Sequence, residues 1–176
     1  RQLPSGPWFE KPWDELIEVA VCSESGHLAT KDCNRVDTVL VPEKGIRSRA
    51  CPYHRTIHLD EAKKFRVDAS CYPVEKMQHE SWFVLPPVME WYYKRSHPEY
   101  KILPQWRNNC SSQGNDRVMQ LVYPEKLSEI YIPTELDGSR GEVVFRVAHR
   151  QPQSTLFWYI DEVYYGQTKK EHQIAL

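Results

Sequence analysis

Five cysteines constrain this chain more than any other feature of its 176 residues: Cys22, Cys33, Cys51, Cys71 and Cys110. Cysteines this dense and irregularly spaced indicate either disulfides in an oxidising compartment or a metal site. Only the doublet Cys51-Pro-Tyr-His54 has metal-like spacing, and with Cys22 and Cys33 it would complete a Cys3His zinc site. Strong zinc signatures pair two such doublets, so the spacing favours disulfides and leaves the metal site as the alternative.

The pairing of the cysteines is predicted from a hairpin. Residues 16–22 alternate as a strand, 23–26 read as a turn, and 27–30 return as the second arm. Cys22 then lies opposite His27, and because bridged cysteines need Cα atoms within about 7 Å, a Cys22–Cys33 bond would break the hairpin. We therefore expect bridges Cys33–Cys51 and Cys71–Cys110, with Cys22 buried and free.

Charge and hydropathy exclude several classes of partner. The 23 Lys and Arg residues nearly balance the 24 Asp and Glu residues, which argues against a protein that binds nucleic acid or an anionic membrane. No apolar run is long enough to cross a bilayer. We expect no nucleic-acid partner and no cofactor.

Three regions are expected along the chain. Residues 1–16, rich in proline and tryptophan, predict a linker or docking segment, and 17–115 predict a cysteine-containing β-rich region. A short helix is expected near 87–96, because Pro86-Pro87 suits a first turn and Val88, Trp91 and Tyr92 share one helical face. The polar, turn-rich segment 107–117 predicts a domain boundary.

Residues 116–176 predict an immunoglobulin-like β-sandwich. Five short strands are expected at 118–123, 129–132, 142–148, 155–160 and 172–176, with Phe145 and Trp158 in the core. The last strand stops without a turn or partner, so we expect a sandwich that is cut short and a chain that is a piece of a longer protein. The fold class is thus mainly β.

Catalytic motifs are missing from the sequence. It contains no Ser-x-x-Lys, Lys-Thr-Gly, Gly-x-Ser-x-Gly or His-Glu-x-x-His. We therefore expect a fragment that is not an enzyme.

Aromatic clusters are the remaining candidate for binding. Most of the rings are expected to pack in a core, and Tyr92, Tyr93 and Trp106 are predicted to be exposed for binding. A stand-alone carbohydrate-binding module is the alternative function. It would require exposed coplanar aromatic rings, and it would lose its support if Trp91, Trp106 and Trp158 all proved to be buried.

Three segments together carry a family resemblance. They are the run 19–29, Cys51-Pro-Tyr-His54 and the run 81–93, and the second half adds Tyr123-Pro124, 130–133, 143–145, 156–158, Asp161, Gly166 and His172. From about residue 17 to 176 the chain resembles the C-terminal region of bifunctional penicillin-binding proteins of the 1C type.

The resemblance implies a peptidoglycan synthase anchored in the inner membrane, with its tail in the periplasm. In such proteins a glycosyltransferase domain polymerises the glycan and a serine transpeptidase domain cross-links the peptides. Both would lie upstream of Arg1, with the membrane anchor, so no catalytic residue carries over to this chain. The implied partners are the chain's own transpeptidase domain, and peptidoglycan or a periplasmic protein.

Overall fold

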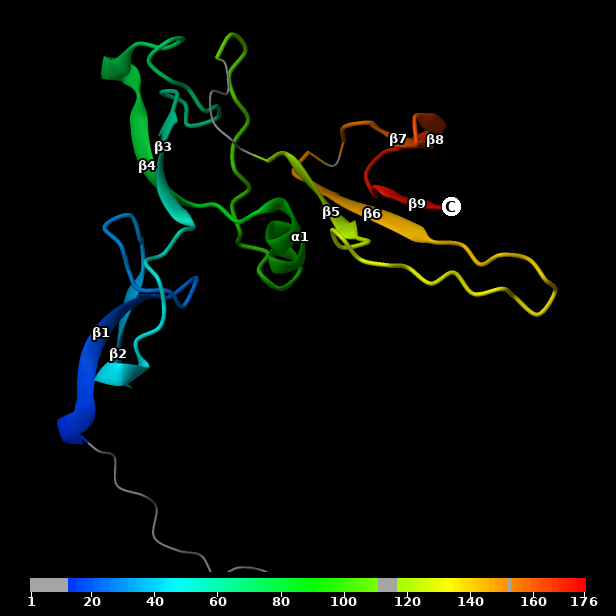
Figure 1. Ribbon diagram of the computed structural model, residues 1–176. Helices are drawn as coiled ribbons and strands as arrows, with labels where there is room; N and C mark the ends of the chain where they lie inside the picture. The colour runs from blue at the N-terminus through cyan, green and yellow to red at the C-terminus, as the bar shows by residue number, and fades with distance from the viewer. Residues whose placement is uncertain (1–12, 111–116, 152) are drawn as a thin grey trace, which may run out of the picture. The chain divides into compact units, whose positions relative to one another are not determined.

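The computed structural model describes residues 13–110, 117–151 and 153–176 (Figure 1). The chain divides into two compact units. Unit 1 contains the described residues up to Ile57 together with His79–Trp82, and unit 2 contains His58–Gln78 and Phe83–Leu176. The described residues are mainly β with a single α-helix, as the sequence predicts. Most of the expected segment 1–16 lies outside the described residues.

Unit 1 is built on a two-stranded antiparallel ribbon. A short 3-10 turn, η1 (Trp13–Glu15), leads into β1 (Leu16–Cys22), which pairs along its whole length with β2 (Val36–Pro42) before the turn η2 (Glu43–Gly45). The predicted arm at 27–30 is reduced to one bridge, Val21 to Leu28. The segment 36–42 replaces it because seven residues make a longer ladder than four.

Two further strands continue from one unit into the other. β3 (His54–Leu59) and β4 (Gln78–Phe83) are hydrogen-bonded neighbours, with the 3-10 turn η3 (Val74–Lys76) just before β4. Their unit 2 ends contribute Leu59 and Phe83 to a core that also contains Val67, Leu85 and Leu103. The disulfide Cys71–Cys110 lies in the same unit.

The helix α1 (Pro87–Ser96) occupies the predicted segment and has proline in its first turn. Its buried face is not purely apolar. Glu90 is 1% exposed, and its Oε2 lies 3.0 Å from Nη1 of Arg150. Because a buried carboxylate needs a partner, this ion pair joins the helix to the segment after β6.

The C-terminal part of unit 2 contains two small sheets. β5 (Met119–Tyr123), β6 (Val144–His149) and β9 (Gln173–Ala175) form one sheet in the order β5-β6-β9, and β7 (Leu156–Ile160) pairs with β8 (Val163–Thr168) in the other. Trp158 is buried as predicted, whereas Phe145 is half-buried. The last strand is not left unpaired, because β9 is hydrogen-bonded to β6.

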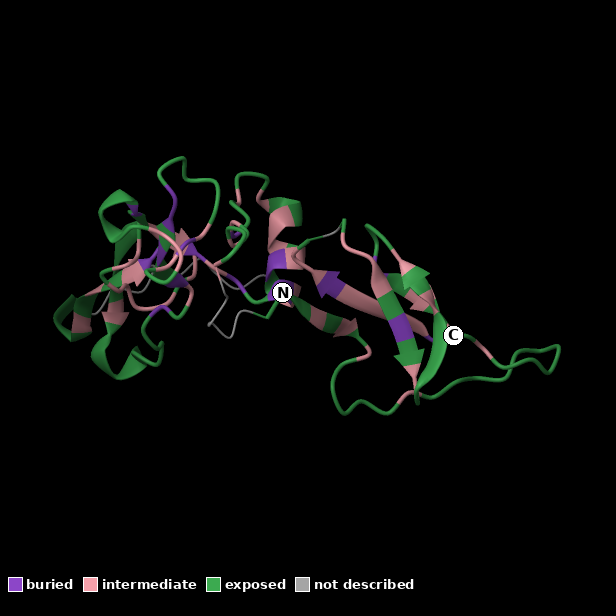
Figure 2. Cartoon of the chain, turned by 90° about the horizontal axis from the view of Figure 1, so that it is seen from above, coloured by how far each residue is buried: buried purple, intermediate pink, exposed green. Residues whose placement is uncertain are grey.

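Several expectations for this half differ from the structure. The five strands described here are fewer than the seven of an immunoglobulin domain. The segment 129–132 forms no strand, because it lies in the long connection between β5 and β6, where Tyr131 is 88% exposed. Most of this connection has the colour of exposed residues in Figure 2. Residues on both sides of 107–117 belong to unit 2, and the domain boundary expected there stays a prediction.

Candidate metal centre

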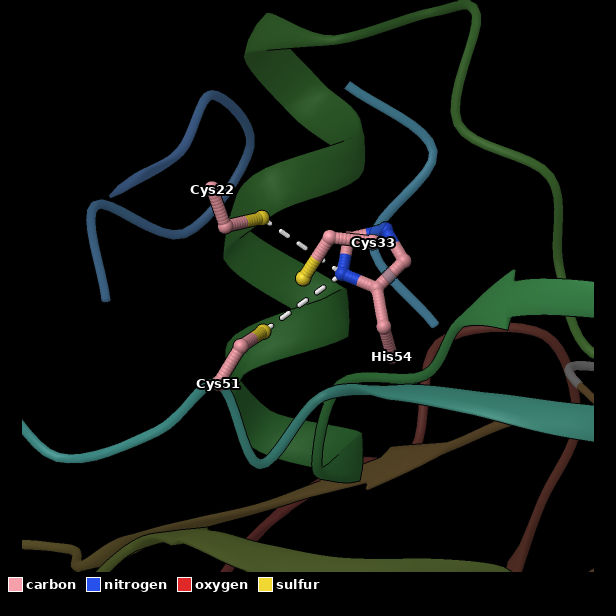
Figure 3. Close-up of side chains that lie close together, drawn as sticks. All are labelled: Cys22, Cys33, Cys51 and His54. Carbon is pink, nitrogen blue, oxygen red and sulfur yellow. Dashed lines mark hydrogen bonds between the residues drawn. The ribbon is translucent and has the colours of Figure 1, made fainter. Parts of the chain in front are cut away.

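Four side chains of unit 1 converge on one point: Cys22, Cys33, Cys51 and His54. Cys22 is the last residue of β1, Cys33 lies in the loop before β2, and Cys51 precedes His54 at the start of β3. Their ligand atoms all lie within 4.8 Å of one another (Figure 3). Cys33 is half-buried and the other three side chains are buried.

Backbone hydrogen bonds bring these segments together. The Cys22 amide donates to the carbonyl of His27 at 2.8 Å, and the Cys51 amide donates to the carbonyl of Leu28 at 2.8 Å. The turn between Cys22 and His27 closes at Gly26, whose φ of 68° is a left-handed conformation that glycine adopts without steric cost. The loop after β1 thus fixes two of the cysteines at once.

Each sulfur accepts hydrogen bonds from its surroundings. Backbone amides of Glu24 and Ser25 point at the Cys22 sulfur, and those of Tyr53 and His54 point at the Cys51 sulfur. The Thr30 amide donates to Sγ of Cys33 at 3.3 Å. Donors arranged in this way stabilise thiolates over thiols.

Burial and hydrogen bonds compete in setting the thiol pKa values. Burial raises the pKa of Cys22. Burial also acts to raise the pKa of Cys51, but hydrogen bonds, of which the one from the Ser25 hydroxyl contributes most, outweigh it and lower this pKa to about 6.

His54 is oriented by a carboxylate. Its Nε2 lies 2.8 Å from Oε2 of Glu24, while its Nδ1 lies 3.5 Å from Sγ of Cys22 and 3.4 Å from Sγ of Cys51. Because a carboxylate accepts the proton of Nε2, the Nδ1 lone pair is directed at the sulfurs. The arrangement matches a metal-binding histidine held by an outer carboxylate.

Of the two predicted disulfides, the structure confirms one and contradicts the other. Cys71 and Cys110 are bonded, with Cα atoms 5.1 Å apart. Cys33 and Cys51 are both free thiols, so the predicted Cys33–Cys51 bridge is not formed. Both sulfurs instead face Cys22 and His54. Cys22 is buried and free, as expected.

The predicted binding aromatics differ in exposure. Tyr92 is 53% exposed, but Tyr93 is half-buried and its ring stacks on His97 with centroids 3.8 Å apart. Trp106 is half-buried, with the Arg66 guanidinium 4.6 Å from its ring centroid. Trp158 is buried and its Nε1 donates to Thr168. Of the three tryptophans named for a sugar platform, only Trp158 is buried, and Trp91 and Trp106 are half-buried.

A basic cleft in unit 2 was not predicted from the sequence. It has a volume of about 290 Å³, and its lining combines one ring, one acid and several cationic or histidine side chains: Trp91, Lys94, Arg95, Arg146, His149, Lys170, Glu171 and His172. The Arg95 guanidinium lies 3.6 Å from the centroid of Trp91. These residues come from α1, β6 and the turn before β9, so no local motif reveals the cleft.

Comparison with known proteins bears on the second half of the chain. Residues 108–176 match the family model described as the Penicillin-Binding Protein C-terminus Family. No curated protein and no solved structure matches the chain. The match supports a penicillin-binding protein C-terminal region that contains β5 to β9, and the 1C type stays a prediction. None of the described helices is long and apolar enough to span a bilayer.

Proposed function

We propose that the chain is a noncatalytic C-terminal accessory region of a membrane-anchored peptidoglycan synthase. The observation that carries this proposal is the family match, which covers all five strands of the C-terminal sheets. Glycan polymerisation and peptide cross-linking belong to upstream domains. The Cys71–Cys110 disulfide supports a periplasmic location, because disulfides persist there. Turnover of a labelled muropeptide by the chain alone would contradict the noncatalytic role.

The cleft at Trp91 is the proposed contact with the cell wall. Peptidoglycan stem peptides carry carboxylates, and the cations that line the cleft complement such groups. Arg95 and Lys170 are both exposed at this site, so an incoming anion reaches them without rearrangement of the core. Trp91 stacks on the Arg95 guanidinium, 3.6 Å from its ring centroid, and so holds this cation at the cleft.

Co-sedimentation with purified sacculi tests this contact. We expect the chain to pellet with the sacculi and the pelleted fraction to fall at high salt, which screens exposed charges. The double variant Arg95→Glu/Lys170→Glu should abolish pelleting, whereas Lys126→Glu, an exposed charge reversal outside the cleft, should not. If the charge-reversal variants all pellet like the unaltered chain and Tyr92→Ala does not pellet, the ionic contact is refuted and an exposed aromatic ring carries the binding.

Unit 1 supplies the proposed contact with the transpeptidase domain. Ile17 pairs with Val41 and Val19 pairs with Val39, so these four apolar side chains share one face of the ribbon. Ile17 is 37% exposed and Val39 is 36% exposed. A two-stranded ribbon is only marginally stable alone, so an apolar cover on this face would stabilise it.

Two neighbouring substitutions test the docking face. Val39→Asp places a charge on the apolar face, and Thr38→Asp places the same charge on the opposite face. We expect Val39→Asp to weaken binding to the purified transpeptidase domain of the same parent protein by roughly tenfold or more, and Thr38→Asp to have little effect. Equal affinities of the two variants would remove the ribbon from the interface.

A further inference from the structure

We propose that unit 1 holds a structural zinc ion on the four converging side chains, Cys22, Cys33, Cys51 and His54. The proposal goes beyond the accessory role above and does not depend on it. Its support is geometric, and it rests on the distances among the ligand atoms, the groups around them and the composition of the unit's interior.

The distances agree with tetrahedral coordination. Zinc–sulfur bonds of about 2.3 Å and zinc–nitrogen bonds of about 2.0 Å at tetrahedral angles place sulfur and nitrogen about 3.5 Å apart. The two distances between Nδ1 of His54 and the sulfurs of Cys22 and Cys51 are 3.5 and 3.4 Å. With all four atoms inside 4.8 Å, a single ion can reach every ligand after small side-chain rotations.

Groups outside the ligands complete the site. Glu24 holds the Nε2 of His54, which leaves Nδ1 to bind the metal. The hydroxyl of Ser25 lies 3.2 Å from the Cys51 sulfur, and the Thr30 hydroxyl lies 3.4 Å from the Cys33 sulfur. These contacts would fix ligand orientation and spread the negative charge of three thiolates.

The ligand set selects zinc and a structural role. Thiolates and imidazole suit zinc, whereas calcium and magnesium require oxygen ligands. Four protein ligands fill the tetrahedron and leave no position for water or substrate, as in structural rather than catalytic zinc sites.

The interior of unit 1 shows what the metal would do for folding. Among the described residues of unit 1, only four are buried: Cys22, Cys51, His54 and Ile57. Three of these four are proposed ligands, and the described residues of this unit contain no disulfide. A unit this small cannot be stabilised by one buried isoleucine, so a metal would supply the missing stabilisation.

Metal analysis of the whole chain tests the proposal. Protein purified without chelator or reductant should contain about one zinc ion per chain, as a closed Cys3His site requires. Cysteines 22, 33 and 51 should resist alkylation until a chelator is added. Replacement of zinc by cobalt should give the visible absorption of tetrahedral thiolate-rich coordination. The variant Cys71→Ala/Cys110→Ala should keep the same zinc content, because its cysteines belong to unit 2.

Two ligand-shell variants sharpen the result. Glu24→Gln should retain the fold and bind zinc about 10- to 100-fold more weakly, the usual cost of losing an outer carboxylate. Cys33→Ser changes the least buried ligand. This variant should lose its zinc at a lower concentration of competing chelator than the unaltered chain does. Unaltered protein without zinc, with a disulfide between any two of the three sulfurs in a non-reducing peptide map, would overturn the proposal. Unchanged zinc affinity in both variants would do the same.

Discussion

Removing the Cys71–Cys110 cross-link should cost unit 2 a large part of its stability. The bridge closes a loop with a sequence separation of 39. Closing a loop of that size removes roughly 13 cal/mol/K of entropy from the unfolded chain, which corresponds to about 4 kcal/mol at 25 °C. We therefore expect Cys71→Ala/Cys110→Ala to lower the free energy of unfolding of unit 2 by about 4 kcal/mol.

The native structure should survive this change, because backbone bonds already join the two segments. The Arg66 amide donates to the Gln105 carbonyl at 2.8 Å, and the Arg107 amide donates to the Arg66 carbonyl at 3.0 Å. The variant then differs from the parent chain mainly in its unfolded state. Substitution is preferable to a reducing agent, which would also act on the free thiols of unit 1.

Guanidinium unfolding, monitored by hydrogen exchange, measures the change in unfolding free energy for each unit separately. Exchange of the amides near Arg66 and Leu103 reports on unit 2, and the zinc content of the variant checks unit 1. The guanidinium concentration at the unfolding midpoint of unit 2 should fall. The slope of its unfolding free energy against guanidinium concentration should equal that of the parent chain or be slightly steeper. A loss below about 1 kcal/mol would refute the reasoning, because it would place the cross-link in a region whose unfolded state is already restricted.

Two other groups of unit 2 give further predictions. Glu90→Gln leaves the partly buried Arg150 without its counter-charge and should destabilise unit 2 by about 3 kcal/mol or more in urea unfolding, whereas Glu99→Gln, at an exposed site, should change little. Burial and then the neighbouring His149 lower the pKa of His172 below its ordinary value of 6.5, so the unfolded chain binds this proton more readily than the folded one. The unfolding free energy of unit 2 should therefore fall as the pH drops below 6.5, and His172→Gln should reduce that slope; equal slopes would refute the assignment.

The sequence predicted elements well where the signal is local. The helix at 87–96 follows from two prolines and one apolar face. β5, β7 and β9 lie within predicted strands, and β6 extends one residue beyond its predicted strand at 142–148. β8 was missed because Tyr165-Gly166 reads as a turn. In the structure Gly166 lies inside the strand opposite Trp158, next to the register shift between Trp158 and Tyr159. A glycine within a strand often marks such an irregularity, and sequence alone does not separate it from a turn.

Pairings between distant segments could not be predicted. The partner of β1 was expected at 27–30, because a hairpin is the nearest pairing, whereas the structure uses the longer segment 36–42. The same limit applied to the cysteines. The four candidate ligands were recognised as a set, but only Cys51 and His54 have a diagnostic spacing, and Cys22 and Cys33 join them through the fold of the loop after β1.

The cysteines of the two units perform different tasks because their surroundings differ. In unit 2, Cys71 and Cys110 cross-link a unit that also has an apolar core, so the bond adds to stability that packing already provides. In unit 1 the cysteines and His54 are themselves most of what is buried. A disulfide there would use only two of the three sulfurs and would leave the third sulfur and Nδ1 of His54 outside the cross-link. One tetrahedral ion satisfies all four groups at once, which is why the same residue type is expected to cross-link one unit and bind metal in the other.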